Sequence, residues 1–299
     1  MKAKDWFMFG VLGLIWGSSF FWIKIALRGT GPFTLVAFRL LFGVLGLAVV
    51  AAIRKPIFPR LRSLWLKLAF LGAVNSAIPI VLISAGEQVI DSAVTSVLNG
   101  TVPLFTILMA HVVLDDDKIT PASLAGLITG FIGIVVLLSR DLNLASFSGG
   151  FAGQAAVLLA AFFYAGSAVY ARRNLRNIPP LLLALIPLFF ADLLVWAAVP
   201  IAEFPFRFPS GGLTWIAILW LGLLGTFVAY LLYFSLLESV GATRTSLVTY
   251  ILPVVGVALG VIFLDELLDF RLVVGAVLIL MGIMFVNLKL QRSPRTANK

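Results

Sequence analysis

Long apolar runs alternate with short polar gaps along the whole chain. An α-helix needs ~20 apolar residues to cross a bilayer, and ten runs are long enough. Glycine, proline and charged residues fill the gaps between them, as in Gly29-Thr30-Gly31-Pro32, which is typical of turns. The pattern therefore predicts ten membrane-spanning helices, near residues 6–26, 33–53, 64–86, 93–113, 120–139, 151–171, 181–201, 213–236, 243–264 and 270–289.

The composition supports the same interpretation. The chain is 61% hydrophobic and 12% charged, with a mean hydropathy of +1.10, whereas a soluble domain has about 45–50% apolar and about 25% charged residues. No cysteine is present, which excludes disulfides, thiolate metal sites and cysteine nucleophiles. The first apolar run is too long for a signal peptide and no small-x-small cleavage site follows it, so we expect a retained first span.

Lysine and arginine are distributed unequally between the gaps. If the N-terminus is cytoplasmic, 16 of the 22 basic residues lie on the cytoplasmic side and 5 on the other, while Arg39 falls within the second span. Cytoplasmic loops of membrane proteins carry an excess of lysine and arginine. We therefore expect both termini in the cytoplasm. The net charge of +9 reflects membrane orientation rather than a nucleic-acid partner.

The two halves of the chain resemble each other. Pro103, followed by Leu114-Asp115-Asp116, matches Pro253, followed by Leu264-Asp265-Glu266. Each half holds five spans, an odd number, so the halves insert in opposite orientations, as in many secondary transporters. We predict an all-α membrane protein in which inverted repeats 1–144 and 145–299 surround a central cavity. Further matched pairs are Trp16 with Tyr164, Ser19 with Ser167, Lys24 with Arg172, Asn75 with Thr226, and Glu87 with Glu238.

Several short motifs resemble the drug/metabolite transporter superfamily, EamA type. They are Trp16-Gly17-Ser18-Ser19-Phe20, Phe38-Arg39-Leu40, Pro103 before an acidic loop, and Pro253 before Leu264-Asp265-Glu266-Leu267. The resemblance covers essentially the whole chain. It implies a ten-helix exporter or permease of small metabolites, often amino acids, that works by alternating access. The sequence departs from the pattern at Tyr164-Ala165-Gly166-Ser167 and at Asp115-Asp116-Asp117, which leaves the substrate subgroup open.

Polar side chains at membrane depth face either a cavity or another helix. For a lone hydroxyl we favour an interhelical hydrogen bond, and for a face that recurs in both halves we favour a pathway. We expect Trp16 and Tyr164 to flank the cavity from opposite halves. The candidate pathway residues are Trp16, Ser19, Arg39, Asn75, Pro79, Asn99, Thr101, Tyr164, Ser167, Tyr230 and Tyr250.

Few charged side chains fall within the spans. Arg39 could pair with a substrate carboxylate or with an acidic side chain. Asp192 could carry a proton, as intramembrane acids often do, or form an ion pair with Arg39, which we favour. Glu87 and Glu238 are further candidates for a proton or an ion pair. His111 is the single histidine and lacks partners for a metal site, so we expect no metal and no cofactor.

No Gly-x-x-x-x-Gly-Lys-Ser/Thr motif is present, so the chain does not bind ATP by a P-loop, and we expect a secondary transporter. The spans also lack the convergent catalytic groups of an intramembrane enzyme, so we do not expect an enzyme. Phosphorylated substrates usually need clustered arginine or lysine. The sparse charge therefore favours neutral or aromatic amino acids, or amphipathic drugs. We expect export across a bacterial-type inner (cell) membrane, with the substrate and the bilayer as partners and a monomer or weak homodimer as the assembly. A lipid or polyprenyl-carrier flippase, or an intramembrane enzyme, remains an alternative.

The substitution Asp192→Asn separates the two interpretations of this acid. An ion pair with Arg39 carries no proton through the transport cycle, so we expect the variant to keep the pH dependence of the wild-type protein. Substrate flux into sealed liposomes, measured across a pH series, provides the check. A flattened pH profile would assign Asp192 to proton transfer instead.

Overall fold

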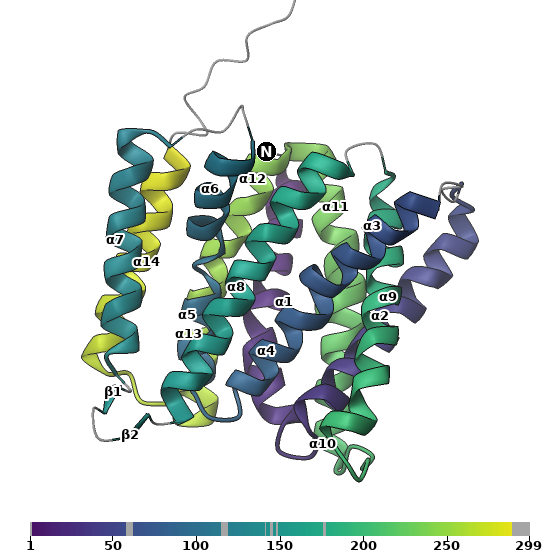
Figure 1. Cartoon of the computed structure of the whole chain (residues 1–299), viewed down its shortest axis with the longest axis horizontal. Helices are drawn as coiled ribbons and strands as arrows, with labels where there is room; N and C mark the ends of the chain where they lie inside the picture. Colours follow the sequence, from purple (N-terminus) through teal and green to yellow (C-terminus); the bar gives the residue numbers. More distant parts are fainter. Residues whose placement is uncertain are drawn as a thin grey trace, which may run out of the picture.

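The computed structural model describes residues 2–57, 62–114, 119–140, 142–143, 146–147, 149–175 and 178–288. The predicted boundary between 1–144 and 145–299, the acidic run at 115–117 and the basic tail after residue 288 lie outside the described residues. Within them the chain is almost entirely helical. Figure 1 shows the helices as one bundle with most of their axes running between the same two ends.

The helices follow one another with short connections. In chain order they are α1 (Ala3–Ala26), α2 (Pro32–Arg54), α3 (Arg62–Gly72), η1 (Ala73–Ala77), α4 (Ile78–Gly86), α5 (Ser92–Asn99), α6 (Val102–Val113), α7 (Pro121–Leu138), α8 (Gly149–Asn174), α9 (Pro180–Ala202), α10 (Gly212–Leu219), η2 (Trp220–Val228), α11 (Ala229–Val240), α12 (Ala242–Ser246), η3 (Leu247–Tyr250), α13 (Ile251–Leu264) and α14 (Phe270–Leu288). One short antiparallel ribbon, β1 (Leu142–Asn143) with β2 (Ser146–Phe147), adds to the predicted all-α fold.

Nine segments of the described chain are long and apolar enough to cross a membrane. The shorter apolar helix Phe270–Val286 coincides with the tenth predicted run. The predicted and observed edges agree to within a few residues. For example, the run predicted at 64–86 is the segment Ser63–Gly86, and the run predicted at 213–236 continues to Val240. Apolar periodicity and length are therefore sufficient to locate these segments.

Local sequence signals explain where several helices begin. Pro32, Pro121 and Pro180 each stand in the first turn of their helix, where no intrahelical hydrogen bond needs the missing N–H. At the start of α7, the backbone N–H of Ser123 donates to the hydroxyl of Thr120 over 3.4 Å. Such contacts satisfy backbone groups that would otherwise have no partner at the end of a helix.

Two spans contain a π-helical segment, in which the helix is locally wider. In the third span η1 precedes Pro79, which has no N–H to donate to the carbonyl of Asn75. In the eighth span η2 contains no proline, and the Thr226 hydroxyl donates to the Leu221 carbonyl over 2.9 Å. The sequence pairs Asn75 with Thr226, so the two segments lie at matching places in the two halves. Such π-helical segments are rare and often mark functional sites.

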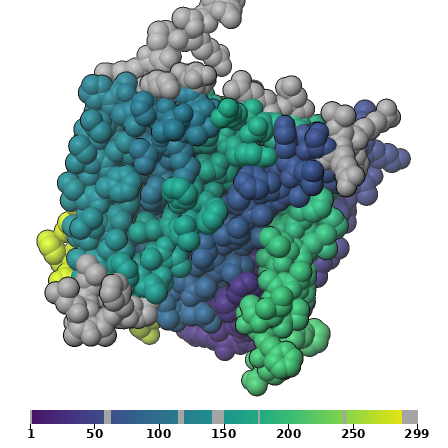
Figure 2. Space-filling view, viewed as in Figure 1, coloured from purple at the N-terminus to yellow at the C-terminus, as the bar shows by residue number. Residues whose placement is uncertain are grey.

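The helices are arranged with two edges and a centre. Figure 1 shows α7 and α14 side by side along one edge, with α2, α3 and α9 toward the other. Helix α1 is central, since it contacts α5, α10, α11 and α13. In the same view Figure 2 shows α6, α7 and α8 on the left and centre of this face and α3, α4 and α9 on the right, with little of the purple N-terminal segment visible.

The two ends of the bundle differ in which elements they hold. The N-terminus and the last turn of α14 lie at one end in Figure 1, and the β1–β2 ribbon and α10 lie at the other. We call the end with the ribbon and α10 the pocket end, because a pocket described below opens there. Which end faces the cytoplasm stays a prediction from the distribution of lysine and arginine.

Helices α7 and α14 approach each other through glycines. A Cβ on Gly282 would lie 2.6 Å from the carbonyl oxygen of Gly126 and 2.6 Å from the backbone nitrogen of Gly130. A Cβ on Gly275 would lie 3.1 Å from the carbonyl oxygen of Gly133. Small residues at such positions let the backbones approach closely and increase the van der Waals contact that drives association of membrane helices.

The substitution Gly282→Ala should lower the stability of the α7–α14 pair, because the added methyl group meets backbone atoms that cannot rotate away. We expect a loss of about 1–3 kcal/mol, the usual cost of overpacking. Thermal unfolding in detergent measures the change. The matched control is Gly10→Ala in α1, where an added Cβ meets no atom within 4 Å. Equal melting temperatures for the two variants would contradict this account of the packing.

Candidate functional site

A buried polar cluster surrounds Arg39, where α2 packs against η2. The residue is 9% exposed, and its Nε donates to the hydroxyl of Thr226 over 3.2 Å. Its charge lies within electrostatic reach of the hydroxyls of Tyr164 and Tyr230. Among the described residues, Arg39 forms no ion pair. A buried guanidinium without a carboxylate partner is costly and is well suited to bind an anion through paired N–H donors.

Neutral groups from η1, α8 and α11 extend this cluster. The hydroxyl of Ser167 donates to Asn75 Oδ1 over 2.7 Å, and Asn75 Nδ2 lies 3.5 Å from the hydroxyl of Ser76. The hydroxyl of Tyr230 hydrogen-bonds the side chains of Asn75 and Ser76. The structure thus brings together five of the predicted pathway residues, namely Arg39, Asn75, Tyr164, Ser167 and Tyr230. Ser76 and Thr226 complete the cluster.

Trp16 and Tyr164 pack against one buried apolar cluster, from α1 and α8 respectively. The ring of Trp16 lies 5.6 Å from that of Tyr233 on α11. Ser19 is buried, and its hydroxyl donates to the carbonyl of Ile15 over 3.1 Å within its own helix. Both aromatic residues are half-buried in the protein. That they flank a transport cavity stays a prediction.

The remaining pathway candidates have local roles in the described structure. Pro79 is buried where η1 meets α4, and Thr101 is buried and donates to the carbonyl of Leu98 over 2.6 Å. Asn99 is half-buried at the end of α5. Tyr250 packs against a different apolar cluster from the one that Trp16 and Tyr164 contact. None of these contacts involves Arg39.

Asp192 does not form the ion pair with Arg39 that the sequence led us to expect. Its carboxylate hydrogen-bonds Trp196, one turn further along α9. Its Oδ1 has no hydrogen-bond partner in the described part of the chain. Although α2 and α9 pack together, Arg39 donates instead to Thr226 of η2. The repeat positions of these two helices predicted their contact correctly but could not predict the direction of each side chain.

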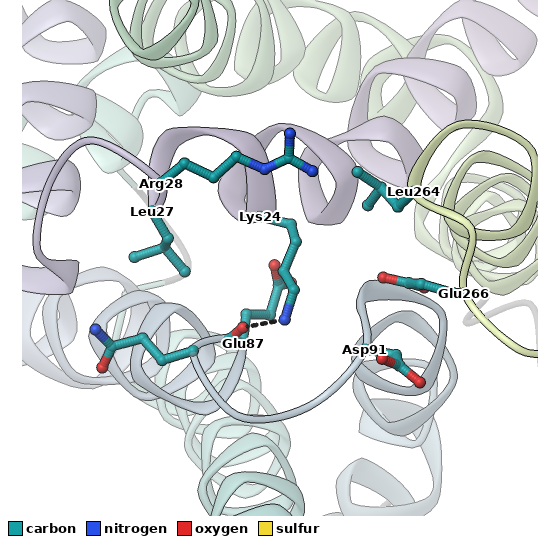
Figure 3. Close-up of a pocket in the computed structure, with 8 residues that line it drawn as sticks. Lys24, Leu27, Arg28, Glu87, Asp91, Leu264 and Glu266 are labelled. Carbon is teal, nitrogen blue, oxygen red and sulfur yellow. Dashed lines mark hydrogen bonds between the residues drawn. The ribbon is translucent and has the colours of Figure 1, made fainter. Parts of the chain in front are cut away.

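A pocket of ≈ 350 Å³ lies at the pocket end of the bundle. Figure 3 shows Lys24 on α1 and Arg28 just after this helix, with the acidic residues near the ends of α4, α5 and α13. Lys24 Nζ donates to the carbonyl oxygens of Glu87 and Ile90 over 2.6 and 2.7 Å, which ties the end of α1 to the α4–α5 connection. The lining residues are Lys24, Leu27, Arg28, Glu87, Gln88, Asp91, Leu264 and Glu266.

Two glutamates from the second half cap helices of the first half at this end. Glu266 accepts hydrogen bonds from the backbone N–H of Ser92 over 2.7 Å and of the next residue over 2.9 Å, at the start of α5. Glu203 accepts from the backbone N–H of Phe33 over 2.7 Å and of the next residue over 3.1 Å, at the start of α2. Each carboxylate satisfies unpaired N–H groups and interacts favourably with the positive end of the helix dipole.

Arg140 connects the neighbouring segments of the pocket end. It forms ion pairs with Asp91 over 3.0 Å and with Asp269 over 2.6 Å, so it joins the α4–α5 connection to the segment before α14. These capping and bridging contacts were not predicted from the sequence. The signal was present as acidic residues in the gaps, next to predicted helix starts, but their partners are far away in the sequence.

Glu87 and Glu238 occupy matching positions in the sequence but differ in burial. Glu87 is 0% exposed, and neither of its carboxylate oxygens has a hydrogen-bond partner among the described residues. Glu238, on α11, is exposed. Close packing of α4 against α8 contributes to this difference, since a Cβ on Gly86 would lie only 2.8 Å from the carbonyl oxygen of Gly153.

Long apolar helices around a buried polar cluster define the chain as a multi-pass membrane protein. The family model described as "EamA-like transporter family" matches residues 6–139 and again residues 151–288. The chain therefore belongs to the EamA-like transporter family and is a membrane transporter. The resemblance found in the motifs around Trp16 and Arg39 is confirmed.

Several curated relatives match most of the chain. An uncharacterized transporter of Archaeoglobus fulgidus is 28% identical over 95% of this chain and 98% of its own length. The probable amino-acid metabolite efflux pump of Salmonella typhimurium is 24% identical over 99% of both chains. The uncharacterized inner membrane transporter YedA of Escherichia coli is 28% identical over 83% of this chain and 79% of its own length.

A crystal structure also shares the fold. Its TM-score to this chain is 0.67, with 19% sequence identity, and the match covers 98% of this chain and 99% of that one. Similarity at this level of identity establishes the arrangement of helices alone.

The substitution Glu266→Ala should free the first amides of α5, because Glu266 is their side-chain acceptor among the described residues. We expect a stability loss of about 1–2 kcal/mol, the cost of losing a helix cap. Hydrogen exchange at Ser92 and the next residue should become faster. The control is Glu238→Ala, which removes an exposed carboxylate that caps no helix start. Unchanged exchange in the Glu266 variant would show that the cap does not stabilise the start of α5.

Proposed function

We propose that this chain exports small zwitterionic metabolites, foremost neutral and aromatic amino acids, across the inner membrane by alternating access. The observation that carries this proposal is the buried guanidinium of Arg39, which lacks an acidic partner in the described structure. A substrate carboxylate would supply the missing negative charge and could accept a bidentate pair of hydrogen bonds. An amphipathic cationic drug would offer no such group, so the geometry favours amino acids between the two predicted classes.

The groups around Arg39 support a substrate of low net charge. Tyr164 and Tyr230 present hydroxyls at the ends of apolar rings, and Asn75 and Ser167 are neutral. Such a lining offers hydrogen bonds and aromatic surface without a second cluster of basic residues. A phosphorylated substrate would require more positive charge than Arg39 provides.

The direction of transport is proposed from the relatives. The Salmonella relative is named as an efflux pump for amino-acid metabolites, and the Escherichia relative is named as an inner membrane transporter. The name of the Salmonella relative makes export of amino-acid metabolites the natural hypothesis for this chain. Transport rather than catalysis also agrees with the neutral character of the groups around Arg39.

Two features support alternating access by a pair of inverted halves. The family model matches the chain twice, and a π-helical segment interrupts the third span of each half at corresponding positions. The halves also touch at both ends. Glu203 and Glu266 cap helices at the pocket end, and Ser239 donates to Asp5 over 2.8 Å at the N-terminal end. Contacts that break at one end while they hold at the other would let the halves rock around Arg39.

The substitution Arg39→Gln should weaken amino-acid binding about 10- to 150-fold, because the loss of a charged hydrogen-bonding partner costs about 1.5–3 kcal/mol. Counterflow of labelled amino acids in liposomes that contain only this protein measures the effect. The matched control is Arg54→Gln, which removes an exposed arginine from the end of the same helix.

Three outcomes of the counterflow experiment can be distinguished. Loss of counterflow in the Arg39 variant alone supports the proposal. Equal counterflow by both variants would show that Arg39 does not hold the substrate. Absence of flux by the wild-type protein across a broad amino-acid panel would contradict amino-acid transport itself, and movement of labelled lipid would then favour a flippase.

A further inference from the structure

We propose that the pocket at the pocket end of the bundle is a second binding site, which takes the zwitterionic head of an α-amino acid between Arg28 and the acidic lining residues. The choice of ligand rests on the proposed function, but the site is separate from the polar cluster around Arg39. The distribution of lysine and arginine predicts that this end faces away from the cytoplasm. In an exporter, the pocket therefore holds the substrate on its way out.

The charges that line this pocket are separated by sign (Figure 3). Lys24 and Arg28 come from α1 and the turn after it. The acidic wall, which consists of Glu87, Asp91 and Glu266, comes from the α4–α5 connection and the segment after α13. The acidic wall repels a phosphate, and the two basic residues repel a metal ion. A zwitterion carries both charges, so each end of it meets the opposite sign.

Arg28 is the basic group of the pocket that a ligand can engage. Lys24 Nζ already donates to two backbone carbonyls, over 2.6 and 2.7 Å. The Arg28 guanidinium is exposed and forms no hydrogen bond or ion pair within the described part of the chain. Figure 3 shows its side chain extended in the direction of Leu264. A guanidinium presents paired N–H donors that match the two oxygens of a carboxylate.

Glu87 gives the acidic wall a charge that no group of the protein uses. Its carboxyl group is enclosed, and neither oxygen has a hydrogen-bond partner among the described residues. Asp91, by contrast, pairs with Arg140, and Glu266 caps α5. A buried carboxylate without a partner is costly. Asp91 and Glu266 are only half-buried, so they meet a ligand ammonium first, and its positive charge also offsets that of the enclosed Glu87.

The size of the pocket and its apolar lining suit a small amino acid. The volume of ≈ 350 Å³ lies near the lower end of the range for small-molecule pockets, about 300–1,000 Å³. Leu27 and Leu264 add apolar surface that the side chain of an amino acid can contact. Leu264 and Glu266 belong to the second half of the chain and the other lining residues to the first. The site therefore lies where the two halves meet.

The lack of cysteine allows this pocket to carry a single reactive thiol. Gln88→Cys introduces it at an exposed position of the lining. In nanodiscs, where both ends of the full chain are accessible, phenylalanine should slow labelling of this thiol by a maleimide. Phenethylamine lacks the carboxylate and phenylpropionate lacks the ammonium. Each should protect about 5- to 10-fold more weakly, between the usual effects of exposed and of buried charged contacts.

Charge substitutions in this reporter protein test which end of the ligand lies where. Arg28→Glu should abolish protection by phenylalanine while phenethylamine still protects, because the new carboxylate repels that of the ligand. The matched control is Arg207→Glu, which changes an exposed arginine outside the lining, in the connection that leads to α10 at the same end. Glu87→Gln should weaken protection by phenylalanine and phenethylamine about 2- to 5-fold and leave protection by phenylpropionate unchanged.

The inference is overturned if phenylalanine does not protect the thiol, or if the three ligands protect it equally. It is also overturned if Arg28→Glu and Arg207→Glu respond alike. An equal effect of Glu87→Gln on all three ligands, or no effect on any of them, would show that the acidic wall does not hold the ammonium.

The same labelling in an Arg39→Gln background separates this inference from the proposed function. Protection that persists there supports a second site. Protection that disappears would show that the thiol reports binding at Arg39, so the second site is wrong and the proposed function stands. If protection persists in this background but the wild-type protein shows no counterflow of amino acids, the proposed function fails and the pocket remains an amino-acid site.

Discussion

Helix ends leave backbone amides and carbonyls without intrahelical partners, and in this protein side chains from distant segments supply those partners. This constraint is most visible at the pocket end. Lys24 satisfies two carbonyls after α4, while Glu203 and Glu266 satisfy the first amides of α2 and α5. The partners come from distant parts of the chain. Local satisfaction of helix ends therefore also fastens the two halves of the transporter together.

The same constraint explains why the interruptions of the helices lie near the polar cluster. The π-helical segments η1 and η2 carry Asn75 and Thr226 to the same region as Arg39. A wider turn frees backbone carbonyls, and side-chain hydroxyls such as that of Thr226 bond to them. A π-helical segment loses regular backbone hydrogen bonds, and this loss is offset where the segment places polar groups around the Arg39 charge. The result is a site in which the Arg39 guanidinium is surrounded by neutral and partly aromatic side chains.

Much of the candidate site was predictable, and the reason lies in the rarity of polar residues in apolar spans. Arg39, Asn75 and Ser167 stand out in their runs, and Tyr164 on α8 and Tyr230 on α11 join them in the structure. The predicted ion pair of Arg39 with Asp192 was wrong, because the packing of two helices against each other does not fix the direction of a side chain. Thr226 is the partner that Arg39 has instead.

Sequence alone determined the spans, their edges and the residue types available for binding, since each depends on local apolar length and composition. It also indicated a repeat and hence treated Glu87 and Glu238 as equivalent. Only the tertiary structure decided that one is enclosed without a hydrogen-bond partner and that the other is exposed. Burial is a property of neighbouring helices rather than of a residue, so the feature that separates these two glutamates exists only once the helices have packed.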